Sequence, residues 1–355
     1  MTRTSGTELT ARSLRRPELG RAGWVLELAG DQRGVVPVPT LQLVLQPVVD
    51  VVVVDADGRV VASCGDPDRE LYARSSMKPF QATVTLSLAP FDFTDAEVAV
   101  MCASHNAEPV HVRTVRSILA RTGVDEGALQ CPSMRPWDDE TLAADPKRRR
   151  INSDCSGKHA GMLAACAAQG WPLANYRAPD HPLQQAVLRS VLRASGREEV
   201  RVGVDGCGVP VHGMPLWAMA TIYARMVAHE RLGDLAPFAE RAVSSMVAEP
   251  YLVAGRNRAD TALMEEAPGA VIAKGGAEAL MCAALLEPRL GIAVKIRDGA
   301  SRASGPAVLH VLRLLGALDE GQVERLAPFA RPAVLGGGEP VGEVRAEFDL
   351  TRVPT

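Results

Sequence analysis

Aromatic residues are scarce in this sequence, where Phe, Trp and Tyr together make up 4% of 355 residues. So few rings give little basis for the stacking platforms on which proteins bind bases or sugars. Basic residues are not in excess either, because 39 Lys and Arg stand against 42 Asp and Glu, a formal net charge of −3. The one basic run, Lys147–Arg150, follows acidic residues and is typical of a solvated loop. The chain therefore lacks the basic footprint of a nucleic-acid-binding protein.

Long apolar runs are absent as well. No window has the length and apolar content of a membrane span, and residues 1–20 lack the apolar core of a secretory signal. Seven cysteines, an odd number scattered over a long chain, indicate a reducing compartment rather than a disulfide framework. We therefore expect a cytoplasmic protein with no membrane partner. We expect residues 1–40 to be a disordered N-terminal extension and residues 41–355 to form one interwoven domain.

The order of the remaining elements predicts an α+β fold. A turn at Asp55–Gly58 between β-branched runs predicts a hairpin over 46–64. Helical spacing and capping residues predict helices near 75–88, 94–101, 110–122, 157–169, 181–195, 215–229, 235–247 and 306–315. Further strands are predicted at 201–204, 271–274 and 290–295. Because strands and helices do not alternate regularly, a doubly wound sheet is disfavoured.

Ser75 and Lys78 stand three residues apart where a helix is predicted to begin. Residues i and i+3 share one helix face, so the lysine amine can reach the serine hydroxyl. A neutral lysine in that position activates serine as a nucleophile. Ser-x-x-Lys is also a signature of serine β-lactamases and penicillin-binding proteins. Taken alone, the pair is more typical of an N-cap serine beside a solvated lysine.

Two later motifs preserve the order of the penicillin-binding signatures. Ser104-His105-Asn106 has the Ser-x-Asn form and lies in a predicted break between helices. Lys274-Gly275-Gly276 follows a predicted strand and resembles Lys-Thr-Gly, and its glycines permit close approach of backbone to a ligand. The three motifs together indicate a serine–lysine hydrolase.

A third group of residues suggests a metal. Cys155 is followed one helical turn later by Lys158, and Cys207 lies in a distant glycine-containing loop. Two thiolates and a neutral amine suit zinc, although such an amine needs a lowered pKa. Buried free thiols are the competing interpretation.

Several blocks resemble the asparaginase II family of the Rhizobium type, from about residue 43 to about residue 335. They are Arg74–Ala82, Met101–His105, Cys155–Leu163, Asp180–Pro182, Asp205–Cys207 and Gly291–Ile296. Cys155-Ser156-Gly157-Lys158-His159 is the most specific of them. The chain departs from the family pattern at Leu45–Asp50, at Cys131–Met134 and at Asp154, where asparagine is usual.

The resemblance implies an L-asparagine amidohydrolase with a serine β-lactamase-like or penicillin-binding-protein-like fold, an antiparallel sheet with flanking helices, usually as a homodimer. It implies Ser75 as nucleophile, Lys78 as its base, and Ser104 with Lys274 as a second serine–lysine pair. It also implies one zinc held by Cys155, Lys158 and Cys207, with no organic cofactor. We place Arg74, His105, His159 and Asp205 on the substrate side, the histidines as hydrogen-bonding groups.

Other functions remain as alternatives. A glutaminase or peptidase-like hydrolase would use the same serine–lysine chemistry on a different amide. A zinc-binding, non-catalytic homologue would need neither pair. If zinc were the catalyst, chelation would abolish turnover while replacement of Ser75 would spare it.

Overall fold

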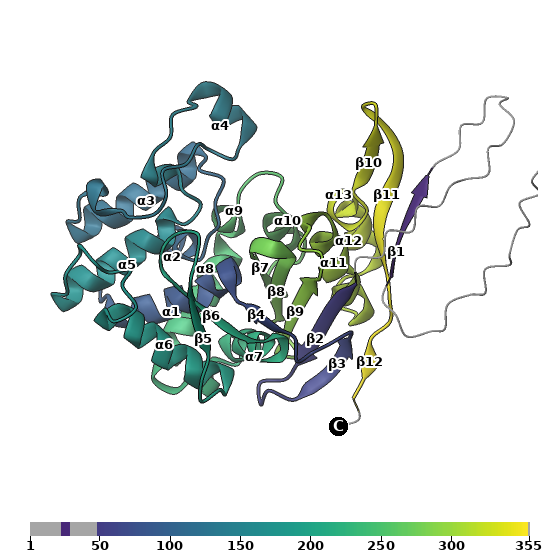
Figure 1. Ribbon diagram of the computed structural model, residues 1–355, viewed down its shortest axis with the longest axis horizontal. Coiled ribbons are helices and arrows are strands. Elements are labelled where there is room, and N and C mark those ends of the chain that lie inside the picture. Colours follow the sequence, from purple (N-terminus) through teal and green to yellow (C-terminus); the bar gives the residue numbers. More distant parts are fainter. Residues whose placement is uncertain (1–22, 29–47, 354–355) are drawn as a thin grey trace, which may run out of the picture.

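A computed structural model describes residues 23–28 and 48–353 of the chain (Figure 1). Its centre is a six-stranded antiparallel sheet in the order β12-β3-β2-β9-β8-β7. These strands are β2 (Val49–Val54), β3 (Val60–Cys64), β7 (Val271–Gly275), β8 (Leu280–Leu285), β9 (Leu290–Ile296) and β12 (Thr351–Arg352). The chain thus contributes its first hairpin and its late strands to one sheet.

The central strands are covered on both faces. All residues of β2 and β8 are buried, which requires apolar cover on each side of the sheet. Helix α7 (Leu216–Val227) packs against β2, β8 and β9, while α11 (Ser304–Leu314) packs against β8 and β9. Helices α12 (Glu320–Arg325) and α13 (Ala327–Ala330) follow beside α11.

The middle of the chain forms a helical region beside the sheet, on the left of Figure 1. It contains α1 (Lys78–Leu88), α2 (Asp95–Met101), α3 (Pro109–Thr122), α4 (Asp139–Ala144), α5 (Ser156–Gln169), α6 (Pro182–Ser195) and α8 (Ala236–Ala248). Helices α9 (Pro250–Val253) and α10 (Ala259–Glu266) lead from this region back to β7. Short 3₁₀ turns cover Arg74–Met77 (η1), Glu126–Ala128, Arg150–Asn152, His229–Leu235, Ala277–Ala279 and Ser301–Ala303.

Two small antiparallel sheets complete the fold. One has the order β4-β6-β5, and the other β1-β11-β10. Their bounds are β4 (Glu70–Tyr72), β5 (Arg201–Val204), β6 (Pro210–Pro215), β1 (Gly23–Leu28), β10 (Ala333–Gly336) and β11 (Glu339–Glu347). Strand β1 belongs to the segment that we expected to be a disordered extension, and the rest of residues 1–40 lies outside the described part.

The predicted α+β class, with an antiparallel sheet flanked by helices, is confirmed. The hairpin over 46–64 corresponds to β2 and β3, and the cap signal at Thr94 is a full capping box with Glu97. Strand β8 was not predicted, because its residues Leu280–Leu285 are Leu, Met, Cys and Ala without a β-branched residue.

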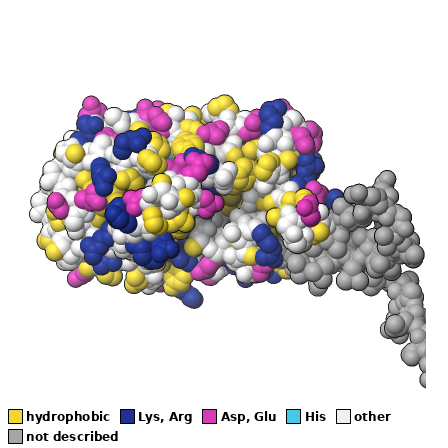
Figure 2. All heavy atoms as spheres, turned by 90° about the horizontal axis from the view of Figure 1, so that it is seen from above, with side chains coloured by type: hydrophobic (Ala, Val, Ile, Leu, Met, Phe, Trp, Pro, Cys, Tyr) yellow, Lys and Arg dark blue, Asp and Glu magenta, His cyan; other side chains and the backbone are white. Residues whose placement is uncertain are grey.

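The surface agrees with the balanced composition. Figure 2 shows basic and acidic side chains interspersed over one face of the molecule. In the described ranges, no helix combines the length and the apolar character needed to cross a bilayer.

Candidate active site

A cavity of about 790 Å³ opens between the helical region and the sheet. Ser75 and Ser104 line it, together with Asp154, Arg258 and Asp260. Its far side is apolar and is formed by Pro306, Phe329, Pro332, Ala333, Val334 and Val344. The structure therefore brings two of the serines that the sequence singled out to one cavity wall.

Ser75 follows a residue in an unusual backbone conformation. Arg74, the first residue of η1, has φ of 48°, a left-handed value that costs a non-glycine residue free energy. Its guanidinium is held by two carboxylates, because Nε donates to Asp205 Oδ1 at 2.8 Å and Nη1 pairs with Glu278. These ion pairs fix the turn that presents Ser75 to the cavity.

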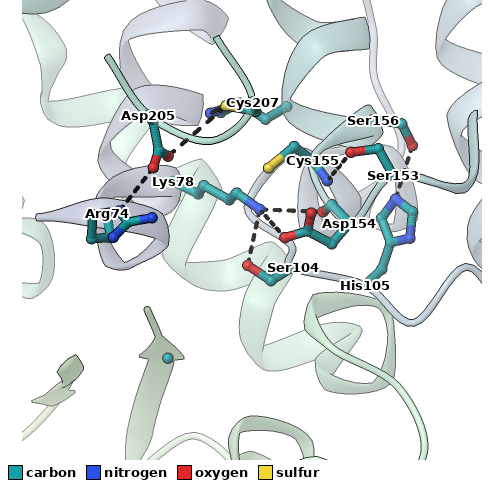
Figure 3. Close-up of polar contacts among 12 residues, drawn as sticks. Arg74, Lys78, Ser104, His105, Ser153, Asp154, Cys155, Ser156, Asp205 and Cys207 are labelled. Atoms are coloured by element: carbon teal, nitrogen blue, oxygen red, sulfur yellow. Dashed lines mark hydrogen bonds and ion pairs between the residues drawn. The ribbon is translucent and has the colours of Figure 1, made fainter. Parts of the chain in front are cut away.

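Lys78 lies one turn after Ser75 and is completely buried. Its three N–H groups have three acceptors: Ser104 Oγ at 2.9 Å, and the carbonyl and Oδ2 of Asp154, both at 3.2 Å. Figure 3 shows the ammonium pointing towards these groups. Burial lowers the pKa of Lys78, but the charges of Asp154, Cys155 and Cys207 together outweigh it and raise that pKa above its usual value. This geometry favours charged Lys78, whereas the sequence hypothesis required its neutral form.

Lys274, at the end of β7, is equally buried but has poorer partners. Its Nζ donates to the Gly275 carbonyl at 2.6 Å and lies 3.5 Å from Asp260 Oδ2. Burial is the main cause that lowers the pKa of Lys274 to about 8; the charges of Lys78 and Arg258 add to it, and Asp260 opposes it. Lys274 is thus the amine that loses its proton more readily.

The glycines after Lys274 bring β7 against η1. A Cβ on Gly276 would lie 2.7 Å from Ser76 Oγ, which leaves no room for a side chain. Ser76 Oγ in turn donates to the Lys274 carbonyl at 3.1 Å. The predicted close approach is therefore real, but the neighbour is the segment that carries Ser75.

Cys155, Lys158 and Cys207 meet beside Lys78. Lys158 Nζ lies 3.0 Å from Cys207 Sγ, and both thiols are buried. A hydrogen bond from Cys155, with the Lys158 ammonium, lowers the pKa of Cys207 far below its usual value, and the same bond raises that of Cys155. The described residues contain no group of three or more His, Cys, Asp or Glu able to hold a metal. The two thiols and the amine still suit zinc in chemical type, provided Lys158 gives up its proton.

The start of α5 depends on a close helix contact. A Cβ on Gly157 would stand 2.0 Å from the Val100 carbonyl oxygen of α2. Only glycine permits this approach, which places Cys155 and Lys158 next to the Lys78 network.

The two predicted histidines are buried behind the site. Nδ1 of His105 accepts from the Ala107 N–H at 3.1 Å, and its Nε2 lies 3.0 Å from Ser156 Oγ. Nδ1 of His159 lies 2.6 Å from the Tyr176 hydroxyl, and the ring also forms a hydrogen bond with Cys207. Burial lowers the pKa of both rings, so they remain neutral at pH 7. Neither is among the described residues that line the cavity, and neither are Arg74 and Asp205.

Sequence reasoning missed three residues of this site. Asp154 was noted only as a departure from the family pattern. Asp260 is the second residue of α10, in a segment for which the sequence predicted nothing, and Arg258 is the N-cap of that helix. A buried acid just before Cys155 was the one available signal. The partners of Asp260 and Arg258 are distant along the chain and give no local pattern.

The chain belongs to the L-asparaginase II family, whose model matches residues 46–346. Family membership supports an asparaginase-like amidohydrolase that acts on a small molecule. The comparison with curated proteins gave no match.

Three solved structures match the chain at low identity and low TM-score. A structure titled "Crystal Structure Analysis of Mglu" has 16% identity and a TM-score of 0.43, and the match covers 76% of this chain and 67% of that one. Simvastatin synthase from Aspergillus terreus, a LovD6 mutant, has 10% identity, a TM-score of 0.37 and coverage of 70% and 86%. A β-lactamase from Mycobacterium bovis has 16% identity, a TM-score of 0.34 and coverage of 77% and 96%. At these TM-scores, no conclusion about activity rests on the likeness.

Proposed function

We propose that this protein hydrolyses the side-chain amide of L-asparagine to aspartate and ammonia, with Ser75 as the nucleophile. The observation that carries the proposal is the position of Ser75 on the cavity wall, one turn before the buried network of Lys78, Ser104 and Asp154. A binding protein needs no such arrangement of two buried lysines around serine hydroxyls. The family match supports the same class of reaction.

The first chemical step joins Ser75 Oγ to the amide carbon of the substrate. The hydroxyl proton must pass to a base, and we assign Lys274 to this role because its pKa of about 8 leaves a neutral fraction near pH 7. Charged Lys78 holds Ser104 and supplies positive charge one turn from Ser75. Collapse of the tetrahedral intermediate breaks the C–N bond while Lys274 returns the proton to the leaving nitrogen, which departs as ammonia. Water then hydrolyses the aspartyl ester and frees Ser75.

Replacement of Ser75 tests the proposal. We expect Ser75→Ala to lower kcat for ammonia release by at least about 10³-fold, since the covalent path is lost. Ser76→Ala is the matched control. The Ser76 hydroxyl is buried against the Lys274 carbonyl, so this variant should retain most activity. A wild-type sample quenched during turnover should carry an aspartyl ester on Ser75 in peptide mass spectra. Near-full turnover by Ser75→Ala would overturn the proposal.

We also propose that Cys155, Lys158 and Cys207 hold one zinc ion. The support is the convergence of two buried thiols and an amine from segments far apart in the sequence. Bound zinc would supply positive charge next to the substrate. Asp205, whose Oδ2 lies 3.9 Å from Cys207 Sγ, would orient this group of residues.

A second candidate is a larger amide as substrate. The cavity of about 790 Å³ exceeds what one free amino acid fills, and its far side is apolar. Steady-state ammonia release with asparagine, glutamine and N-acylated or peptide-linked asparagine would decide between the candidates. A higher kcat/KM for the acylated amides would favour the second.

A homodimer in the cytoplasm completes the proposal. The family resemblance supports the dimer, and seven free cysteines support a reducing compartment. Light scattering after gel filtration would measure the number of chains per particle.

A further inference from the structure

One cation in the cavity forms no salt bridge with any of the described residues. The described lining residues include two arginines, Arg258 and Arg302. Arg302 pairs with Asp298 at 2.9 Å. Within residues 48–353, Arg258 forms no salt bridge. Its charge helps to lower the pKa of the Asp260 carboxyl, but that carboxylate pairs with Lys274 and accepts from the Gly275 N–H. A half-buried guanidinium with no salt-bridge partner of its own, beside Ser104, points to an anionic group on the ligand.

Arg258 is held rigidly by neutral groups. Its Nη1 donates to Asn106 Oδ1 at 2.9 Å and to the Ser104 carbonyl at 3.3 Å. The guanidinium lies over the ring of Trp137, 5.6 Å from the centroid. Nε and Nη2 carry the other three N–H groups of the guanidinium, and no partner for them occurs in the described part of the chain.

Hydrogen bonds join the segments next to Arg258, which come from different parts of the chain. The Trp137 N–H donates to the Asn106 carbonyl at 2.9 Å, and the Asn106 N–H to the Ala254 carbonyl at 3.0 Å. Asn106 Nδ2 donates to the Arg256 carbonyl at 2.8 Å. These bonds hold the backbone of Trp137, whose side chain is 50% exposed, so that its ring can lie against the guanidinium of Arg258. They also fix Arg258 relative to Ser104.

We propose that Arg258 binds the α-carboxylate of the substrate and thereby restricts the enzyme to amides of α-amino acids. A guanidinium fork matches a carboxylate with two parallel hydrogen bonds, which a lysine cannot reproduce. Arg74 does not suit this task, because Asp205 and Glu278 already neutralise it. This inference rests on the proposed function, because it places the carboxylate in the cavity that holds Ser75.

The test compares L-asparagine with 3-aminopropanamide, which keeps the amine and the amide but lacks the carboxylate. We expect Arg258→Met to lower kcat/KM for asparagine by about 100-fold and to change kcat/KM for 3-aminopropanamide less than about threefold. Arg258→Lys should restore only part of the loss. Arg302→Met is the matched control and should affect neither substrate. An equal loss on both substrates would assign Arg258 a positioning role and overturn the inference.

A binding measurement separates this inference from the proposed function. Calorimetric titration of Ser75→Ala with L-aspartate, the expected product, needs no turnover. We expect binding by Ser75→Ala and its loss in Ser75→Ala/Arg258→Met, with circular dichroism and melting temperature unchanged. Binding that survives in the double variant, or is absent from both, overturns the role of Arg258. Binding by Ser75→Ala combined with a wild type that releases no ammonia would instead overturn the proposed function alone.

Discussion

Two lysines of one site have opposite pKa shifts because their surroundings differ. Lys78 has three good acceptors and a carboxylate at 3.2 Å, whereas the carboxylate beside Lys274 is 3.5 Å from Nζ and neighbouring charges repel that amine. Pairs of titratable groups whose pKa values are pushed apart commonly divide acid and base roles. Here the division assigns proton transfer to Lys274 and charge stabilisation to Lys78.

The rate should therefore rise with pH. A base acts only when neutral, so kcat/KM for asparagine should increase as pH rises through about 8, the pKa of Lys274. Steady-state ammonia release measured between pH 6 and about pH 10 would show this rising limb of the pH–rate profile. Lys274→Gln should be about 10²-fold slower and should lack the limb. A wild-type profile that is flat across pH 8 would contradict the assignment.

The same shift affects stability. Because the folded pKa of Lys274 is lowered, the unfolded chain binds this proton more tightly than the native protein between about pH 8 and 10.5. The contribution of Lys274 to the free energy of unfolding therefore becomes more favourable as pH rises through that window. Its burial as an ammonium costs stability below pH 8.

Strand β2 shows how one buried charge can be part of an apolar element. All six residues of Val49–Val54 are buried, and one of them is Asp50. Arg297 donates to both Asp50 oxygens, at 2.8 and 2.6 Å; Arg69 pairs with Oδ2, and the Asp66 N–H donates to Oδ1 at 2.8 Å. Burial raises the pKa of a carboxyl, but these four donors outweigh it and lower that of Asp50.

Removal of this carboxylate should destabilise the sheet. We expect Asp50→Ala to lower the free energy of unfolding by about 3–5 kcal/mol, because Arg69 and Arg297 lose their shared partner. Urea unfolding followed by circular dichroism would measure it. Asp298→Ala, which breaks the partly exposed pair with Arg302 and an exposed hydrogen bond from the Ala300 N–H, should cost less than about 1 kcal/mol. Since the pKa of Asp50 is lowered, its contribution is present above about pH 4 and is lost as pH falls through the lowered value. Equal costs for both variants would contradict this account.

Local elements were predictable from the sequence because their signals are local. The Ser75–Lys78 spacing, the Thr94 cap and the hairpin at β2 and β3 each depend on neighbouring residues. The carboxylates beside the two lysines could not be assigned this way, since Asp154 reaches Lys78 over 76 positions. Strand β8 was missed because burial between two strands, rather than intrinsic preference, determines its conformation.

At the scale of the whole molecule, the three zinc-binding candidates connect separate parts of the fold. Cys155 and Lys158 belong to the start of α5, whereas Cys207 lies in the turn between β5 and β6. A metal bound there would link the helical region to the small sheet. Its binding energy would then contribute to the stability of the entire chain.

Metal content and thermal stability should change together. We expect purified protein to contain about one zinc per chain by plasma mass spectrometry. Chelation should lower its melting temperature by several degrees. Cys207→Ser should abolish both zinc binding and the effect of the chelator on the melting temperature. Cys166 is a buried thiol of α5 outside the proposed site, so Cys166→Ser should retain both. Zinc retained by Cys207→Ser would exclude these ligands.

The ion pairs of Arg74 have a consequence for the order in which activity appears during folding. The turn before Ser75 is held by Asp205, 131 positions later, and by Glu278, 204 positions later. A nascent chain that ends before Glu278 lacks one of the two ion pairs that offset the left-handed conformation of Arg74. The turn before Ser75 is therefore held by both acids only when the chain extends past Glu278. A fragment that ends before Glu278 should be inert, so turnover reports assembly up to that point.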